Sequence, residues 1–284
     1  MSVRVASVLT HRRASDTAAA IAALVGAARR AGVTLRFDAE ETRKHGLLPG
    51  EGLELDAELS ADVDLCVVMG GDGTILTALR EYADTRVPVF AVNFGEVGFL
   101  ATLDPDGLDA DFDRAFSGDF ETLELQGITV GRPEGTWTAM NDMSVHRKPG
   151  FRVADLGYAL TGEEIGRVRC DGLVVSTPQG STGYNLANGG PVLAWGVAGF
   201  VVSFIAPHSL TARALVVAPD DLLTINNRSR EEPVEVHVDG RPVVELQPGE
   251  DVHVEFARSS ALLAQLPGAS FYHRLRERFG RLAQ

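Results

Sequence analysis

The chain has 284 residues, of which 45% are hydrophobic and 23% are charged, and its formal net charge is −13. This composition indicates a folded globular protein, with enough chain for one large domain or two ordinary ones. The acidic balance argues against sequence-independent nucleic-acid binding, which relies on basic surfaces. The longest apolar run, Gly199 to Ala206, is too short to span a bilayer. Since no secretory leader pattern opens the chain either, we expect a cytoplasmic protein that contacts no membrane.

The first third of the chain alternates between strand and helix patterns. Ser15 is placed to cap the first helix and Gly32 to end it, and a further helix is expected to run to about Tyr82. A segment with Gly, Pro and charged residues, 44–54, is expected to be a loop. The strand patterns lie at residues 3–9, 33–37, 63–69 and 87–92. Such alternation predicts a mostly parallel sheet with helices on its faces.

After about Ser117 the helical periodicity fades and β-rich segments follow one another. The last of them, residues 234–244, alternates around Asp239-Gly240 and predicts a hairpin. The others lie at residues 122–125, 137–140, 156–160, 172–176 and 200–204. We therefore predict an α/β domain of residues 1–117 plus 258–284 and an all-β, sandwich-like domain of residues 118–257. A basic helix at 271–282 is expected to pack back on the α/β domain.

The two cysteines, Cys66 and Cys170, lie far apart in the chain and each has apolar neighbours. Both are therefore expected to be reduced packing residues, as in a cytosolic protein.

The motif Gly70-Gly71-Asp72-Gly73-Thr74 falls between a buried strand and a helix. Open α/β sheets bind ligands at this end of their strands, where helix amides attract anions and glycines allow phosphate to approach. Neither a Walker A motif nor a Rossmann G-x-G-x-x-G is present, because Leu76 occupies the third glycine position. A tight glycine turn without function is the alternative for this motif taken alone.

A second polar segment, Asp171 to Pro191, is dense in glycine and lacks the charge of a plain surface loop. Its mix of short polar groups and a flat ring suits a nucleoside. The groups that could line such a site are Ser176, Thr177, Ser181, Thr182, Tyr184 and Asn185. A third element, Asn141-Asp142, could grip a ribose diol, since a carboxylate accepts two hydroxyl hydrogen bonds.

These motifs, together with Asn93–Leu100 and Pro207–Arg213, occur in the order seen in bacterial NAD kinases, and the chain resembles that family over most of its length. The five-residue glycine motif alone is shared with diacylglycerol, sphingosine and 6-phosphofructo-kinases, whereas the 171–191 block is more specific. Three positions depart from the usual family pattern, and they bear on fine substrate preference: Phe94, Asp142 and Gly183.

The resemblance implies transfer of a phosphoryl group from ATP, or from polyphosphate, to the 2′-hydroxyl of the adenosine ribose of NAD. Asp72 matches the catalytic aspartate, Gly71 and Gly73 the phosphate-approach positions, and Asn141 with Asp142 the pair that holds adenosine. The nucleoside-binding stretch is matched by Thr182, Gly183, Tyr184, Asn185 and Ala187. The resemblance also implies Mg²⁺ bound to the donor's oxygens, with no protein metal site, and a homo-oligomer, a dimer or tetramer.

Four further positions match the family more loosely. Asp171 matches an acid that meets the other end of the dinucleotide, often from a neighbouring subunit, and Arg169 a position linked to choosing NAD over NADH. Arg152 and Arg241 match weaker ligand positions, with ordinary surface arginines as the alternative.

Two other functions stay open on the sequence: a lipid or sugar kinase that shares the glycine motif, and a non-catalytic NAD(P)-binding sensor. The polar 171–191 block disfavours the first, and the acid at Asp72 disfavours the second. His146 and His237 alternate with apolar neighbours and are expected to pack within strands. No set of His, Cys and carboxylate residues has zinc spacing. The last helix is expected to present a solvated face or a subunit contact made by its arginines, Arg274, Arg276, Arg278 and Arg281.

Overall fold

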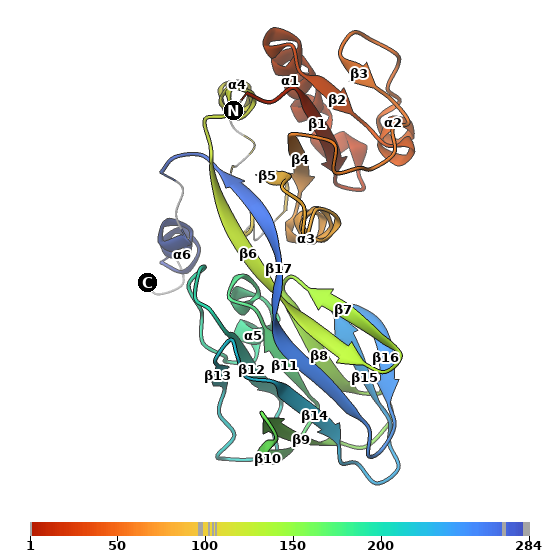
Figure 1. Ribbon diagram of the computed structural model, residues 1–284, viewed down its shortest axis with the longest axis vertical. Helices are drawn as coiled ribbons and strands as arrows, with labels where there is room; N and C mark the ends of the chain where they lie inside the picture. Colours follow the sequence, from red (N-terminus) through yellow and green to blue (C-terminus); the bar gives the residue numbers. More distant parts are fainter. Residues whose placement is uncertain are drawn as a thin grey trace. The chain divides into compact units, whose positions relative to one another are not determined.

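The computed structural model describes residues 2–95, 99–101, 103, 105, 107–268 and 271–280. The chain separates into two compact units, Met1–Glu124 with Ala261–Gln284 and Leu125–Ser260, whose elements are labelled in Figure 1. The unit boundaries fall a few residues further along the chain than the expected ones. The reason is that two long strands, β6 (Glu121–Arg132) and β17 (Asp251–Gln265), continue through them.

The first unit is built on a parallel sheet with the strand order β3-β2-β1-β4-β5, to which the end of β17 is added beside β5. Every residue of β4 and β5 is buried, as expected for strands covered by helices on both faces. The strands other than β17 are β1 (Val5–Thr10), β2 (Thr34–Arg36), β3 (Leu53–Glu54), β4 (Leu65–Gly70) and β5 (Pro88–Asn93). The predicted mostly parallel α/β fold of this part of the chain is confirmed.

The strand order reverses between β1 and β4. From β1 the chain moves outward through β2 and β3, and it then returns to β4 on the other side of β1 and continues to β5. Ligands of open α/β folds bind at such a switch point, beyond the carboxyl ends of the strands. The glycine motif, which follows β4 directly, is therefore at the edge of the sheet where a ligand is expected.

The helices of this unit are α1 (Ala14–Ala31), α2 (Ala39–His45), α3 (Asp72–Glu81), α4 (Leu108–Ser117) and α6 (Phe271–Phe279). Helices α1 and α4 pack together and are joined by an ion pair between Arg30 and Asp113 with an N–O distance of 2.9 Å. Their apolar faces meet the sheet in a core that includes Leu24, Phe90 and Phe112.

Two local predictions for the first unit are wrong. Residues 44–54 are not all loop, because α2 extends to His45 and β3 occupies Leu53–Glu54. The side chain of Asp38 accepts a hydrogen bond from the Glu41 amide and caps the start of α2. The Gly, Pro and charged residues of 44–54 obscure the end of this helix in the sequence. Helix α1 begins at Ala14, so Ser15 lies inside it and bonds Asp16 instead of capping. Gly32 ends α1 as predicted, with φ of 69°.

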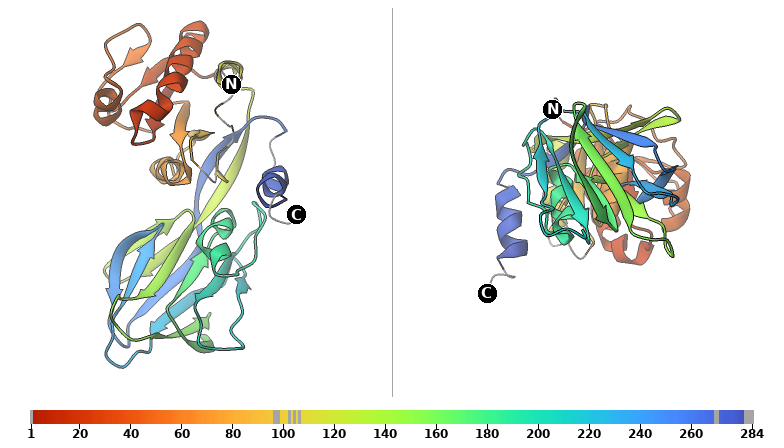
Figure 2. Two further views of the ribbon diagram at one scale, coloured as in Figure 1. Left: turned by 180° about the vertical axis from the view of Figure 1, so that it is seen from behind. Right: turned by 90° about the horizontal axis from the view of Figure 1, so that it is seen from below.

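The second unit is a sandwich of two antiparallel sheets, visible from two further directions in Figure 2, and the predicted all-β fold is confirmed. One sheet has the order β13-β12-β11-β8-β15-β16, and the other contains β10-β9-β14-β17, with β6 and β7 attached. Their facing side chains form one core, including Val145 and Leu173 from the first sheet and Ile225 and Val252 from the second.

The strands of the second unit not yet bounded are β7 (Gly135–Ala139), β8 (Asp142–Arg147), β9 (Ala154–Leu160), β10 (Glu163–Cys170), β11 (Gly172–Ser176), β12 (Phe200–Ile205), β13 (Leu215–Val217), β14 (Leu223–Asn227), β15 (Val234–Val238) and β16 (Arg241–Leu246). Strand β8 is central to the first sheet, between β11 and β15. A short 3₁₀ turn, Gln179–Thr182, and helix α5 (Tyr184–Ala187) follow β11. The hairpin β15–β16 turns at Asp239 and Gly240, both with positive φ, as predicted.

Candidate active site

The glycine motif forms the passage from β4 to α3 in the first unit. Gly70 is the last residue of β4, Gly71 precedes the helix, and Asp72 is its first residue. The Asp72 side chain is therefore in the first turn of the helix, where the backbone amides carry partial positive charge. Gly70 is paired with Asn93, the last residue of β5, so the carboxyl ends of the two strands lie side by side.

Two of the three glycines of the motif, Gly71 and Gly73, have different surroundings. The backbone of Gly71 packs against that of Gly95, and a Cβ on Gly95 would lie only 2.7 Å from the Gly71 Cα. Asn93 fixes this approach, because its side-chain oxygen accepts a hydrogen bond from the Gly95 amide at 2.9 Å. A Cβ on Gly73 would meet no atom within 4 Å. Space beside Gly73 is therefore open, whereas the close approach of the Gly71 backbone requires a glycine at position 95.

Asp72 is partly buried and accepts two hydrogen bonds from consecutive backbone amides. Its Oδ1 receives the Leu100 amide at 3.1 Å and its Oδ2 receives the Phe99 amide at 3.4 Å. These bonds fix the plane of the carboxylate and leave further lone pairs for a substrate hydroxyl. Of the Asn93–Leu100 motif, residues Glu96–Gly98 lie outside the described part of the chain.

In the second unit, Asn141-Asp142 forms a turn at the start of β8 that a distant carboxylate holds. Asp239 accepts the backbone amides of Met140 at 3.1 Å, Asn141 at 2.8 Å and Asp142 at 3.2 Å. In return the Asp239 amide donates to the Asp142 carbonyl at 2.8 Å. Nearly a hundred residues separate Asp239 from this turn in sequence, and the sequence pattern around Asp239 indicates only a hairpin turn.

The charge of Asp239 acts on the neighbouring Asp142. Burial and, second, repulsion by Asp239 raise the pKa of the Asp142 carboxyl from 3.8 to about 7. The side-chain oxygen of Asn141 is buried and has no hydrogen-bond partner among the described residues. A buried acceptor of this kind requires a donor, and a hydroxyl or amino group of a bound ligand would supply one.

A row of three rings lies close to this turn. His146 stacks on Tyr184 with ring centroids 5.8 Å apart, and it makes an edge-to-face contact with His237 at 4.9 Å between centroids. Burial and the neighbouring His237 lower the pKa of His146, which favours the neutral ring. Burial, followed by the charges of Asp142 and Asp171, raises the pKa of Tyr184. The two histidines pack within strands as predicted, and the row they form with Tyr184 was not foreseen.

The 171–191 segment divides into an inner and an outer side. Asn185 is fully buried, and its amide nitrogen donates to the carbonyls of Ser181 and Pro191, both at 2.9 Å. Ser176, Thr177 and Ser181 are also fully buried and bond backbone carbonyls. These four side chains hold the segment in shape, and the expectation that they line a nucleoside stays a prediction. Thr182 is partly buried, and the exposed members of the predicted set are Gly183, Tyr184 and Ala187.

Asp171 is paired with an arginine that the sequence analysis did not consider. Nε of Arg147 donates to Oδ1 of Asp171 at 2.6 Å, and the two residues stand at the ends of adjoining strands. Asp171 remains about one-third exposed, so a ligand can still reach it.

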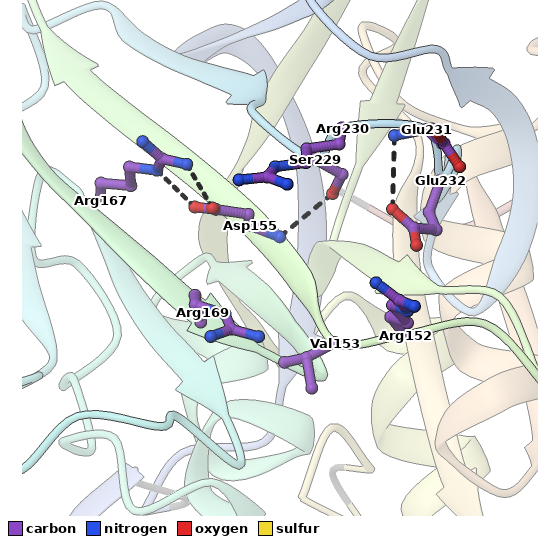
Figure 3. Close-up of a pocket in the computed structure, with 9 residues that line it drawn as sticks. All are labelled: Arg152, Val153, Asp155, Arg167, Arg169, Ser229, Arg230, Glu231 and Glu232. Carbon is purple, nitrogen blue, oxygen red and sulfur yellow. Dashed lines mark hydrogen bonds and ion pairs between the residues drawn. The ribbon is translucent and has the colours of Figure 1, made fainter.

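Arg152 and Arg169 line one pocket of about 570 Å³, shown in Figure 3. Two other arginines, Arg167 and Arg230, also line it, and Arg167 is turned to Asp155, with which it makes a two-pronged ion pair. Glu231 and Glu232 form another part of its wall. The remaining arginine of the predicted set, Arg241, is exposed at the start of β16 and does not line this pocket.

The predicted site residues thus fall into three groups. Gly71, Asp72 and Gly73 belong to the first unit, where the switch point is. Asn141, Asp142 and Tyr184 come together in the second unit beside Asp239, and Arg152 and Arg169 share a pocket in that unit. Within the described part of the chain, no three His, Cys, Asp or Glu side chains are placed to hold a metal ion. No helix there is long and apolar enough to cross a membrane.

Comparison with protein families gives two matches that together cover most of the chain. Residues 9–120 match the ATP-NAD kinase N-terminal domain, and residues 140–266 match the ATP-NAD kinase C-terminal domain. A curated relative from Rhodopirellula baltica, named NAD kinase, is 38% identical over 225 residues, which are 77% of this chain and 72% of the relative. Another NAD kinase, from Gemmatimonas aurantiaca, is 33% identical over 279 residues, which are 96% of this chain and 94% of the relative.

Two solved structures share the fold at lower sequence identity. Yeast NADH kinase in complex with NADH superimposes with a TM-score of 0.86 at 22% identity, and it covers 100% of this chain and 89% of its own. An NAD kinase from Archaeoglobus fulgidus in complex with ATP gives a TM-score of 0.75 at 23% identity, with 98% of both chains covered.

Proposed function

Because the chain belongs to the NAD kinase family, we propose that it transfers the γ-phosphoryl group of ATP to the 2′-hydroxyl of the adenosine ribose of NAD and produces NADP. In this step a bond forms between the 2′-oxygen and the γ-phosphorus, and the bond from that phosphorus to ADP breaks. The hydroxyl proton passes to a carboxylate. The observation that carries the proposal is the placement of Asp72 at the switch point of the sheet, beside the open face of Gly73.

Asp72 is the proposed acceptor of that proton. A sugar hydroxyl is a very weak acid, so a carboxylate cannot remove its proton early. In a loose phosphoryl-transfer transition state the hydroxyl becomes acidic late, and orienting it is the main task. The amides of Phe99 and Leu100 hold the Asp72 carboxylate for this purpose. General-base assistance of this kind typically contributes ~10²–10⁴-fold.

The second unit is proposed to hold the dinucleotide. Asp142 would accept hydroxyl hydrogen bonds from a ribose, and Asn141 would use the side-chain oxygen that has no partner within the described residues. Tyr184, stacked on His146, offers a flat surface to a base. Among the residues assigned on the family pattern, Thr182, Gly183 and Ala187 are proposed to line the nucleoside, and Asp171 the far end of the dinucleotide.

Mg²⁺ is proposed to arrive with the donor nucleotide. No described group of three or more metal-ligating side chains offers it a site, and Mg²⁺ prefers phosphate oxygens and water. When bound there it would neutralise the charge of the transferring phosphoryl group. Use of polyphosphate as donor, action in the cytoplasm, a homo-oligomeric state and the preference for NAD over NADH through Arg169 are further parts of this proposal.

One assay separates the proposal from its alternatives. The purified protein is incubated with Mg²⁺ and ATP, and with NAD, NADH, a diacylglycerol, sphingosine or fructose 6-phosphate, and phosphorylated products are identified by mass spectrometry. We expect NADP from NAD and no lipid or sugar phosphate. Tight NAD binding without NADP would favour a sensor, and phosphorylation of a lipid or sugar alone would favour another kinase of the superfamily.

A further inference from the structure

The C-terminal helix α6 contributes a buried arginine that the mechanism above does not use. Arg274 was expected on a solvated face or at a subunit contact, but it is only 7% exposed within the single chain. Its Nη1 donates to the carbonyl oxygen of Phe99 at 3.0 Å. Arg281 and the side chain of Arg278, which belong to the same predicted face, lie outside the described part of the chain. A buried guanidinium is expensive unless paired or bonded, so its position requires an explanation.

The carbonyl that Arg274 contacts belongs to the peptide unit that also contacts Asp72. The peptide between Phe99 and Leu100 has the Phe99 oxygen at one end and the Leu100 amide at the other. The first accepts from Arg274 at 3.0 Å, and the second donates to Asp72 Oδ1 at 3.1 Å. Guanidinium, peptide dipole and carboxylate therefore form one continuous chain, in which each hydrogen bond polarises the next.

We infer that Arg274 is a positioning residue for phosphoryl transfer, which acts on Asp72 through the Phe99–Leu100 peptide. The inference rests on the proposed function of Asp72. The Arg274 guanidinium holds the Phe99–Leu100 peptide so that its amide points at the Asp72 carboxylate. The peptide in turn fixes the plane of that carboxylate. Arg274 does not touch the substrate, so its loss should impair the chemical step more than the binding of either substrate.

The test compares three full-length variants. Arg274→Gln removes the charge, and Arg274→Lys keeps the charge and a donor. Arg276→Gln is the matched control, because Arg276 is exposed on the same helix and bonds His273. Misplacement of a catalytic group by a small distance costs about 10²-fold in rate. For Arg274→Gln we expect a loss of kcat of about that size, with KM for NAD and ATP changed by less than about threefold. Arg274→Lys should recover much of the rate, and Arg276→Gln should behave as wild type.

Two measurements distinguish positioning from general support of the fold. In an Asp72→Asn background, Arg274→Gln should have no further effect on the residual rate, because its target is already removed. The Leu100 amide resonance of ¹⁵N-labelled protein should shift in both Arg274→Gln and Asp72→Asn, while the rest of the spectrum stays folded. This resonance reports the contact whether or not the protein makes NADP, so failure of the proposed function is seen separately.

Three results would overturn the inference. These are a kcat of Arg274→Gln within about twofold of wild type, an equal fractional loss in the presence and absence of Asp72, and a Leu100 resonance that does not respond to Arg274. A loss that appears in KM with kcat unchanged would also count against it, since it would indicate a binding role.

Discussion

The surroundings of the Asp142 carboxyl group shift its pKa strongly. Burial and the charge of Asp239 raise its pKa to about 7, so at neutral pH the group is divided between its protonated and ionised forms. If the ionised form accepts the ribose hydroxyls, NAD binding must release the proton from those molecules in which Asp142 is protonated. Affinity for NAD should then weaken as pH falls below about 7, by up to about tenfold per unit, and level off above it.

Calorimetric titration of NAD between pH 5.5 and 8.5 measures this dependence, with pH values chosen to bracket the pKa of about 7. Asp142→Asn is the control, because it has no proton to release, and its affinity should be flat over the range. A flat wild-type profile, or the same slope in Asp142→Asn, would contradict the assignment.

Because the pKa of Asp142 is raised in the folded state, ionisation of Asp142 costs stability as pH rises through about 7. Asp142→Asn should therefore melt at a higher temperature than wild type at pH 8.

Asp239 holds the turn at Asn141-Asp142 and raises the pKa of Asp142, and Asp239→Asn tests both effects. Asparagine tolerates the positive φ of this position, 45°, and keeps one acceptor oxygen. Loss of the charge weakens three backbone hydrogen bonds, so we expect the free energy of unfolding to fall by about 1–3 kcal/mol. It also removes the repulsion on Asp142, so the midpoint of the NAD-affinity profile should move to lower pH. Denaturant unfolding and the calorimetric series measure the two effects, and an unmoved midpoint would show that Asp239 does not act on Asp142.

At the residue scale, a role that depends on neighbours in sequence can be predicted. A role that depends on a hydrogen bond to a residue far away in sequence cannot. Asp72 could be placed because a strand, glycines and a helix surround it directly in sequence. Asp239 and Arg274 could not, because their partners, Met140 to Asp142 and Phe99, lie about a hundred residues away or more. Asn185 shows a different limit of the sequence. Its residue type suits a ligand, and only the packed structure shows that the side chain turns inward.

Among the elements, the contact between the ends of β4 and β5 determines the geometry of the glycine turn. Gly95→Ala would place a Cβ 2.7 Å from the Gly71 Cα, so backbone must shift and the protein should lose stability and activity together. Gly73→Ala meets no atom within 4 Å and should keep its melting temperature. If a phosphate group of ATP occupies that space, the alanine methyl group of Gly73→Ala should raise KM for ATP instead.

Thermal unfolding and steady-state kinetics of Gly95→Ala and Gly73→Ala test this division. Equal melting temperatures for the two variants would contradict the packing argument. An unchanged KM for ATP in Gly73→Ala would show that the donor does not approach this glycine.

The elements themselves were predictable where a clear period or a turn signal marks them. Strands β4 and β5 are continuous apolar runs, and the β15–β16 hairpin carries Asp239-Gly240 at its turn. Helix α2 was missed because only seven residues form it and its cap, Asp38, is the main local signal. Short elements of this kind are stabilised by tertiary contacts, here the buried bonds of Glu41 to Thr10.

At the scale of the whole chain, each unit has its own apolar core and contains one cysteine. Cys66 in the first unit and Cys170 in the second are both buried, and burial raises the pKa of each thiol to about 12. Neither should react with a thiol reagent in the native protein, since the thiolate is the reactive form. The rate of labelling at each cysteine in rising denaturant should then report the opening of its own unit. Rapid labelling without denaturant would contradict the burial of that thiol.

The central claim is that Asp72 performs the chemistry while other residues bind NAD. The most direct measurement is a comparison of wild type with Asp72→Asn, using NADP formation from ATP and NAD together with calorimetric affinity for NAD. We predict that the variant binds NAD as wild type does and loses at least about 10²-fold in kcat. Retention of half the wild-type rate, or loss of NAD binding with kcat intact, would contradict the account.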